Sequence, residues 1–378
     1  MKLSDFDYLL PEERIAQRPL ENRDASRMLV MERALASGEA GLRFEDRLFS
    51  ELPSLLRGDE LVVVNNARVI PARLLGRRVG PKALPGGSEG GEGEIEILLS
   101  RQLDENKWEG LVRPGRKMHV GQRVQFGDGR LEAEVTGHAN YGQRTLRFFA
   151  SRDASKGTSE GQTGGSVQEL MNEIGHMPLP PYIERADEEA DRERYQTIFA
   201  NRPGAIAAPT AGLHFTPKIL DQIRTRGVEI CELTLHVGLG TFQPMRGETL
   251  EEHRMHSEAY EISGELTEKI TAAKKEGRRI LAIGTTTVRA LEAAALSAKE
   301  NGADGVVRAG KADANLFITP GFSFRVVDAL LTNFHLPRST LLALVSALAG
   351  RERILEAYRH AVEAGYRFYS YGDCMLIR

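Results

Sequence analysis

Cysteine, tryptophan and long apolar runs are scarce in this chain. Its 378 residues include two cysteines, Cys231 and Cys374, and one tryptophan. Two cysteines this far apart form neither a disulfide framework nor a metal-binding pair, so we expect both to be reduced and buried. The longest apolar run, residues 341–349, is far too short to span a bilayer. The first seven residues carry acids and no apolar core, unlike a secretory signal, so we expect a cytoplasmic location without a membrane partner.

A strong net charge is also missing. Fifty lysines and arginines stand against 53 acidic residues, giving a net charge of −3 and a pI of about 6.4. This balance excludes a globally basic nucleic-acid coat, but it leaves room for a local basic patch. Hydrophobic content of 41% and charged content of 27% are typical of a soluble globular protein. The length favours two or three domains.

The pattern of expected helices and strands changes along the chain, and this change predicts an inserted domain. Strands alternate with helices in residues 1–65 and 167–378, which predicts a large three-layer α/β domain with a largely parallel sheet, formed by both chain ends. Residues 66–166 contain short strands separated by turns, a pattern of a small sandwich or barrel, and we favour a smaller inserted β-barrel domain. Segments 80–93 and 151–166 are rich in glycine and polar residues, so we expect flexible surface loops.

The α/β region carries clear helix signals. Thr216 and Pro217 suit the N-cap and first position of a helix that ends near Arg226. Further helices are predicted over residues 265–275 and 286–299, and one or two more within residues 341–365. Glycines or capping residues at their ends mark where each helix begins or stops.

Two irregular segments each place a histidine beside a phenylalanine. Residues 208–215 end in His214-Phe215, and residues 332–340 contain Phe334-His335. Neither segment has the period of a helix or a strand, so we expect loops of fixed shape. Histidine moves protons near neutral pH, and catalytic groups often lie on such loops. We predict that His214 and His335 transfer protons; the alternative is that each ring only fixes its loop through hydrogen bonds.

The strongest ligand-binding signal lies at residues 283–289. A predicted strand ends at Gly284 and a helix begins among the three threonines that follow, where free N–H groups favour an anion. Arg289 adds a guanidinium fork for a carboxylate or phosphate. Capping of the helix by Thr285 or Thr286 is the simpler interpretation and is compatible with ligand binding. The segment lacks the P-loop pattern of nucleoside triphosphatases.

Motifs for metal or dinucleotide binding are not found. His253, His256 and Glu258 lack the spacing that places two histidines and a glutamate on one helix face, so we assign no metal. Gly238 and Gly240 form a Gly-x-Gly, but the third glycine of the dinucleotide fingerprint is missing. A hydrolase would need a nucleophile motif such as Gly-x-Ser-x-Gly, which we do not find.

Eight segments, in order, resemble one family along nearly the whole chain. They are residues 5–11, 23–27, 65–73, 177–183, 208–215, 235–242, 332–340 and 371–373. The chain resembles the S-adenosylmethionine:tRNA ribosyltransferase-isomerases of queuosine biosynthesis. Ala67, Ala343 and Cys374 replace the Thr, Met and Ala expected in that family, and none of them is a predicted proton-transfer residue.

The resemblance implies an unusual use of S-adenosylmethionine. Its ribosyl part moves onto a 7-aminomethyl-7-deazaguanine base in a tRNA anticodon and is isomerised, which gives epoxyqueuosine while adenine and methionine leave. S-adenosylmethionine is then a consumed co-substrate, and no cofactor is implied. We expect a monomer whose partners are this co-substrate and the anticodon loop. The alternative is a non-catalytic RNA-binding module that uses the barrel as its platform.

The implied chemistry gives the predicted residues their roles. One histidine, His214 or His335, would act as base at the ribose C5′–H and the other as acid at adenine, in an order the sequence leaves open. Asp373 or Glu258 would read the guanine-like edge, and Phe242 is a further aromatic candidate for the sulfonium. The predicted S-adenosylmethionine-binding residues are Gly284, Thr285, Thr286, Thr287, Arg289, Phe215, Phe334 and Asn333. The predicted tRNA-binding residues, which would grip phosphates, are Arg23, Arg27, Arg68 and Arg73.

Overall fold

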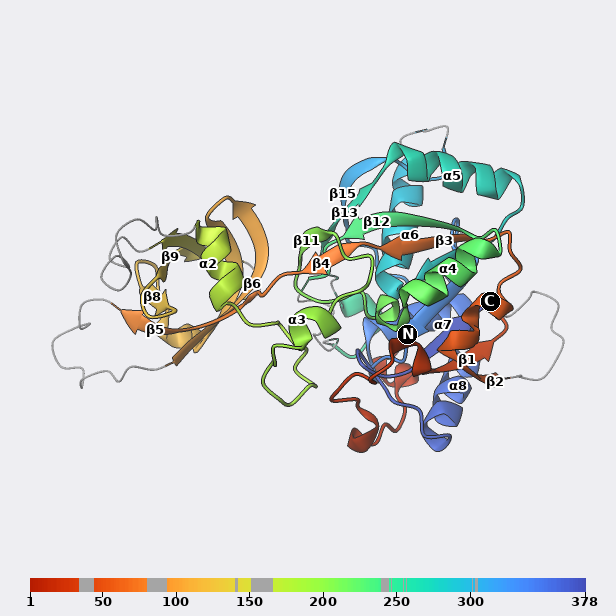
Figure 1. The fold of residues 1–378 in the computed structure, drawn as a ribbon, viewed down its shortest axis with the longest axis horizontal. Coiled ribbons are helices and arrows are strands. Elements are labelled where there is room, and N and C mark those ends of the chain that lie inside the picture. The colour runs from red at the N-terminus through yellow and green to blue at the C-terminus, as the bar shows by residue number, and fades with distance from the viewer. Residues whose placement is uncertain are drawn as a thin grey trace. The chain divides into compact units, whose positions relative to one another are not determined.

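The chain forms two compact units in the computed structural model (Figure 1). The structure describes residues 1–33, 44–79, 94–139, 142–150, 166–238, 245, 247–253, 255, 257–300, 302 and 305–378. The first unit holds residues 1–68, 180–185 and 194–378, and the second holds residues 69–179 and 186–193. The predicted loops at 80–93 and 151–166 lie outside the described residues, except for Ser166, which caps a helix.

The first unit is built on a nine-stranded sheet of order β15-β13-β12-β3-β14-β16-β17-β1-β2. Its strands are β1 (Arg27–Met31), β2 (Phe44–Leu48), β3 (Leu61–Asn65), β12 (Glu229–Leu235), β13 (Glu258–Ile262), β14 (Ile280–Ile283), β15 (Gly310–Ala314), β16 (Ala329–Asn333) and β17 (Cys374–Ile377). The central run β12-β3-β14-β16 is parallel, and so is the pair β17-β1. The remaining pairs are antiparallel. The sheet is therefore mixed, and the expected largely parallel arrangement holds for the central run, where helices supply the crossovers that parallel neighbours need.

Each face of this sheet carries its own core, because neighbouring side chains on a strand point to opposite faces. In β3, Leu61 and Val63 join one apolar cluster while Val62 and Val64 join the other. Four helices pack on the first face: α5 (Gly264–Lys275), α6 (Thr285–Glu300), α7 (Thr340–Ala349) and α8 (Arg351–Glu363). Helices α1 (Leu52–Leu55) and α4 (Pro217–Thr225) pack on the second face. The predicted three-layer α/β architecture is confirmed.

Local sequence signals explain where these helices begin. The Thr216 hydroxyl accepts a hydrogen bond from the Ile219 amide at 3.3 Å, so it caps α4 as predicted, with Pro217 at the first position. Ser263 caps α5 and Ser339 caps α7 in the same manner. The caps fix the ends of the segments that lead into the helices.

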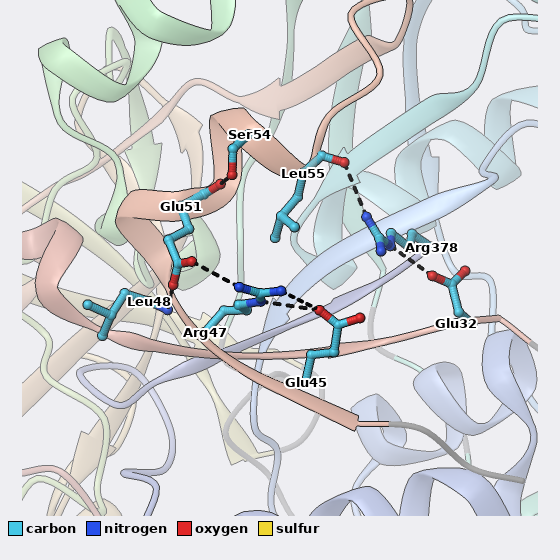
Figure 2. Close-up of polar contacts among 8 residues, drawn as sticks. All are labelled: Glu32, Glu45, Arg47, Leu48, Glu51, Ser54, Leu55 and Arg378. Atoms are coloured by element: carbon cyan, nitrogen blue, oxygen red, sulfur yellow. Dashed lines mark hydrogen bonds and ion pairs between the residues drawn. The ribbon is translucent and has the colours of Figure 1, made fainter.

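The side chain of Arg378 bonds residues that follow β1 and end α1 (Figure 2). Arg378 donates from Nε to Glu32 at 2.9 Å and from a terminal nitrogen to the Leu55 carbonyl at 3.2 Å. Strand β2 forms the sheet edge and exposes charged side chains, among them Arg47, which pairs with Glu45 at 2.9 Å. Charges along an edge strand disfavour pairing with another chain.

The second unit is a closed six-stranded barrel of order β10-β7-β6-β5-β8-β9. Its strands are β5 (Arg73–Val79), β6 (Glu94–Asp104), β7 (Lys107–Arg113), β8 (Arg123–Phe126), β9 (Leu131–His138) and β10 (Arg144–Ala150). Helix α2 (Val167–Ile174) belongs to this unit, since Glu173 pairs with Arg130 at 2.8 Å and Ile174 packs on Gly127. The barrel is confirmed, and the unit that contains it continues past the expected end at residue 166.

Two further strands and one further α-helix are described outside the large sheet and the barrel. They are β4 (Ala67–Val69), β11 (Arg202–Ala205) and α3 (Asp191–Arg194).

Candidate active site

A pocket opens in the first unit where β14 and β16 end. Ligands in α/β sheets bind outside the carboxyl ends of the strands, because helix N-termini and loops converge there. We call it the Gly284 pocket, and it contains about 670 Å³ not filled by protein atoms, part of it open to solvent. Its lining residues are Tyr182, Ala207, Ala208, Pro209, Thr210, Ala211, Val237, Gly284, Thr285, Thr286, Thr332, Asn333, Phe334, His335, Leu336, Ser339, Leu341, Tyr369 and Ser370.

The start of α6 forms one wall of this pocket. Gly284 has a φ of 90°, which favours glycine, and its amide bonds the Leu331 carbonyl at 2.8 Å. The first N–H groups of the following helix have no partner within the helix. The Thr286 hydroxyl lines the pocket, is buried, and has no hydrogen-bond partner among the described residues. Thr287 turns inward and bonds the Ile283 carbonyl at 2.7 Å, so it does not face the pocket.

Arg289 lies elsewhere than expected. Its side chain is 4% exposed and forms a buried ion pair with Glu258, which is 3% exposed. It also donates to the carbonyls of Ala314 at 3.0 Å and Leu316 at 3.3 Å. Because its position on α6 turns it toward β13 and β15, Arg289 holds the sheet and does not line the Gly284 pocket. The structure therefore does not bring Arg289 to the pocket beside Gly284.

His335 borders the Gly284 pocket. Its Nε2 lies 3.1 Å from the Thr332 hydroxyl, while its Nδ1 has no partner among the described residues. Burial lowers the pKa of His335 to about 3, because the charged ring would lose its water, so the ring is neutral at pH 7. A neutral imidazole that donates from Nε2 to Thr332 keeps a lone pair on Nδ1. Nδ1 is therefore the ring atom able to accept a proton, although the lowered pKa makes the ring a weak base in the substrate-free protein.

His214 does not border that pocket, so the two histidines predicted to transfer protons do not both line it. It lies in a 3₁₀ helix at Thr210–His214, contacts the Phe49 ring in a tilted arrangement at 5.3 Å, and lines a smaller pocket with Arg23 and Ser26. Its Nδ1 lies 2.9 Å from the Ser26 hydroxyl and its Nε2 lies 3.3 Å from Oδ1 of Asn333. Burial lowers the pKa of His214 to about 4, although the bond with Asn333 opposes this shift.

The predicted aromatic and amide residues divide between pocket and core. Phe334 and Asn333 line the Gly284 pocket. Asn333 donates from Nδ2 to the Tyr369 carbonyl at 2.8 Å. Phe215 is fully buried and packs edge-on against Phe49 at 5.0 Å, so it belongs to the apolar core. Because Phe215 packs into the core, the neighbouring His214 is also placed outside the lining of the Gly284 pocket.

The four arginines predicted to bind phosphates differ in whether their side chains already contact other protein groups. Arg23 donates to the carbonyls of Gln196 at 2.7 Å and Leu213 at 3.3 Å. Arg27 pairs with Asp46 at 3.2 Å and lies over the Tyr366 ring. In the barrel unit, Arg73 donates to the Leu179 carbonyl at 3.1 Å. Arg68 is exposed and has no side-chain partner among the described residues. Arg23, Arg27 and Arg73 thus already hold protein groups in this structure.

The pocket residues that the sequence prediction did not name include Tyr182, Tyr369 and Ser370. The Tyr182 hydroxyl bonds Ser370 at 2.7 Å, and the Tyr182 and Tyr369 rings lie 4.6 Å apart. Tyr369 has a φ of 70°, which is unusual for a residue other than glycine. Residues 177–183 and 371–373 were noted as motifs, but side-chain contacts between segments this distant carry no local signature.

The residues considered for metal or base recognition have other partners. Among the described residues, no group of three His, Cys, Asp or Glu side chains is placed to hold a metal ion. His256 and Phe242 lie outside the described residues. Glu258 accepts from the Gly238 amide at 2.8 Å, and Asp373 accepts from the amides of Arg27 at 2.9 Å and Arg367 at 2.8 Å. Both carboxylates therefore hold backbone in this structure.

The described part of the chain contains no helix with the length and apolar character needed to cross a membrane.

Comparison with known proteins shows likeness over the whole chain. The family of queuosine biosynthesis proteins matches residues 3–377. An S-adenosylmethionine:tRNA ribosyltransferase-isomerase of Desulfitobacterium hafniense is 47% identical over 377 residues, and one of Solibacter usitatus is 49% identical over 385 residues, each covering 100% of both chains. The crystal structure of S-adenosylmethionine tRNA ribosyltransferase from Thermotoga maritima matches with 35% identity and a TM-score of 0.50, covering 99% of this chain and 100% of that one.

Proposed function

The chain belongs to the queuosine biosynthesis protein family, and from that premise we propose that it moves the ribosyl part of S-adenosylmethionine onto a 7-aminomethyl-7-deazaguanine base in a tRNA anticodon and isomerises it. The products are epoxyqueuosine-tRNA, adenine and methionine. The name shared by the relatives supports an enzyme, a transferase, over a non-catalytic RNA-binding module. One structural observation carries the proposal: His335 and an anion-ready helix start border the same pocket.

The start of α6 suits the methionine carboxylate. A helix N-terminus presents N–H groups and a partial positive charge to an anion. The unpartnered Thr286 hydroxyl adds a donor at the same wall of the pocket. Gly284 allows close backbone approach because it carries no Cβ. In this proposal the carboxylate is held by backbone and hydroxyl groups, with Arg289 acting on the sheet behind them.

The sulfonium lies against aromatic rings in this proposal. A cation is attracted to the faces of aromatic side chains within about 6 Å. Tyr182, Phe334 and Tyr369 line the Gly284 pocket, whereas Phe215 lies in the core. These three rings replace Phe215 as the candidates for this contact.

His335 serves as both base and acid in the proposed reaction. The sulfonium acidifies the neighbouring C5′–H, and the neutral ring of His335 accepts that proton on Nδ1. Because burial lowers the pKa of His335 to about 3, the protonated ring is a strong acid. It then gives the same proton to a nitrogen of adenine, which leaves as a neutral base. His214, which lies outside the pocket, takes no part in these two transfers.

The partners follow from the substrates. An anticodon base is reached most easily when it is splayed from a single-stranded loop into a pocket. Exposed Arg68 is the best placed of the four predicted arginines to bind a phosphate, since its side chain has no partner among the described residues. We further propose that the protein acts as a monomer in the cytoplasm, with S-adenosylmethionine consumed and no cofactor.

A single assay tests this function. The chain is incubated with S-adenosylmethionine and tRNA that carries the aminomethyl precursor base, and released adenine is measured. Parallel reactions contain the same tRNA with unmodified guanine, or no tRNA. We expect adenine and methionine in equal amounts with precursor tRNA alone. The absence of release with competent tRNA would overturn the proposal, and release without tRNA would indicate a small-molecule hydrolase.

A further inference from the structure

The peptide group of His335 is held on both sides by tyrosine hydroxyls. The Tyr8 hydroxyl donates to the His335 carbonyl at 2.5 Å, and the Tyr358 hydroxyl accepts from the His335 amide at 3.1 Å. Tyr8 comes from the N-terminal segment and Tyr358 from α8, so two distant parts of the chain meet at one peptide. Neither hydroxyl lines the Gly284 pocket, so neither contacts the substrate there.

The N-terminal segment is tied to the same loop at two further points. The Arg338 amide donates to the Phe6 carbonyl at 2.9 Å, and Arg338 Nε donates to Asp7 at 2.8 Å. Arg338 has a φ of 54°, a backbone conformation that costs energy in residues other than glycine. The surrounding contacts must therefore hold residues 335–338 in their shape.

Both phenols are protonated at neutral pH. Burial is the largest cause that raises the pKa of Tyr8 and of Tyr358 far above 10. The two rings also pack against each other edge-on at 5.1 Å, and Tyr358 packs against Phe334 at 5.2 Å. A change from Tyr to Phe removes only the hydroxyl and leaves this ring packing in place.

We propose that Tyr8 and Tyr358 are positioning residues that aim the His335 ring into the Gly284 pocket. The inference rests on the proposed function for its kinetic consequence, and on geometry alone for the orientation of the ring. Their hydroxyls act on the backbone, so their loss moves Nδ1 of His335 away from its place while the rest of the pocket stays intact. A shift of about 1 Å at a reacting group can cost about a hundredfold in rate.

The test compares Tyr8→Phe and Tyr358→Phe with a matched control, Tyr366→Phe. Tyr366 packs against Phe334 in the same aromatic cluster, but its hydroxyl bonds Asp46 at 2.6 Å and not His335. We expect kcat for adenine release to fall about tenfold in each test variant, with KM for S-adenosylmethionine within about twofold. We expect the double variant to lose less than the product of the two single effects, since both hydroxyls hold one peptide. Tyr366→Phe should keep its kcat.

A second measurement needs no activity. Nitrogen-15 NMR of labelled histidine reports the ring environment of His335 in the substrate-free protein, with the signal assigned from His335→Gln. The His335 signals should shift in Tyr8→Phe and Tyr358→Phe and stay in place in Tyr366→Phe, while Tm falls by at most about 4 °C in each. Unchanged His335 signals in both test variants, or an unchanged kcat in both, would overturn the positioning role. Inactivity of the wild-type chain with competent tRNA would overturn the proposed function instead, and the NMR result would still decide the positioning role.

Discussion

The Oδ1 atom of Asn333 lies 3.3 Å from Nε2 of His214. Asn333 uses its Nδ2 to donate to the Tyr369 carbonyl, so its oxygen accepts the His214 N–H. Nδ1 of His214 lies 2.9 Å from the Ser26 hydroxyl, which also lies 3.1 Å from the Arg23 carbonyl. Asn333 lines the Gly284 pocket and His214 does not. Asn333 therefore links His214 to the Gly284 pocket, whereas His335 borders that pocket directly.

Alanine variants distinguish the two histidines. We expect His335→Ala to lower kcat by about 10² to 10⁴, the usual contribution of a general acid–base residue. His214→Ala should lower kcat by only about tenfold, because it loosens Asn333 without removing a proton acceptor. A double variant of His214 and Asn333 should lose little more than Asn333→Ala alone. Steady-state adenine release measures all four variants, and equal losses in His214→Ala and His335→Ala would contradict this assignment.

Acid should unfold the protein through these two buried rings. Burial lowers the pKa of His335 to about 3 and that of His214 to about 4, whereas histidine in an unfolded chain titrates near 6.5. Between about pH 6.5 and pH 4 the unfolded state binds more protons than the folded state. Stability is therefore fully present above about pH 6.5 and is lost as pH falls toward the folded pKa values, with a slope of about 1.4 kcal/mol per pH unit for each histidine.

Urea unfolding between pH 4.5 and 7.5 measures this slope. His335→Gln should lose about half of the contribution expected from the two rings. His119→Gln serves as control, since His119 is exposed on the barrel unit. A slope that His335→Gln leaves unchanged would show that another group governs acid unfolding.

The sequence identified the pocket's location better than the orientation of its side chains. Gly284 and Asn333 were found because strand ends and helix starts have local signatures, and parallel strands bring such ends together. The face that Arg289 occupies depends on Glu258, which lies 31 positions earlier and pairs with it only after the sheet has formed. Tyr182 and Tyr369 also come into contact only in the folded chain. Neither segment has a periodic pattern from which that contact could be predicted.

The barrel illustrates the same limit. Its strands alternate apolar and polar residues, so their existence was predictable. The extension of the unit to Leu179 depends on α2 packing against Gly127 through Ile174. The helix pattern of residues 167–174 is equally compatible with either unit, because it shows which face is apolar and not what covers it.

Thr286→Val should weaken the binding of S-adenosylmethionine without weakening the fold. The Thr286 hydroxyl has no partner among the described residues, so its loss costs the unliganded protein no hydrogen bond. A hydrogen bond to a charged group contributes about 1.5–3 kcal/mol, which corresponds to roughly a tenfold or greater loss of affinity. Isothermal titration calorimetry gives Kd directly. Thr287→Val is the matched control: its hydroxyl bonds the Ile283 carbonyl, so stability should fall while Kd stays within about twofold. Equal Kd values for Thr286→Val and wild type would remove Thr286 from the carboxylate site.

Breaking the Arg289–Glu258 pair should lower the free energy of unfolding of the first unit more than the substitutions proposed in the pocket do. Both side chains are almost fully buried, and removing one partner leaves an uncompensated charge, at a cost of about 3–5 kcal/mol. We therefore expect Arg289→Met to lower the free energy of unfolding in urea by this amount. Arg289→Met combined with Glu258→Gln should recover part of the loss, because no buried charge is left alone. If Arg289 bound the substrate instead, Arg289→Met would raise Kd for S-adenosylmethionine and leave stability nearly unchanged. Unfolding curves and calorimetry on the same variant separate these two results.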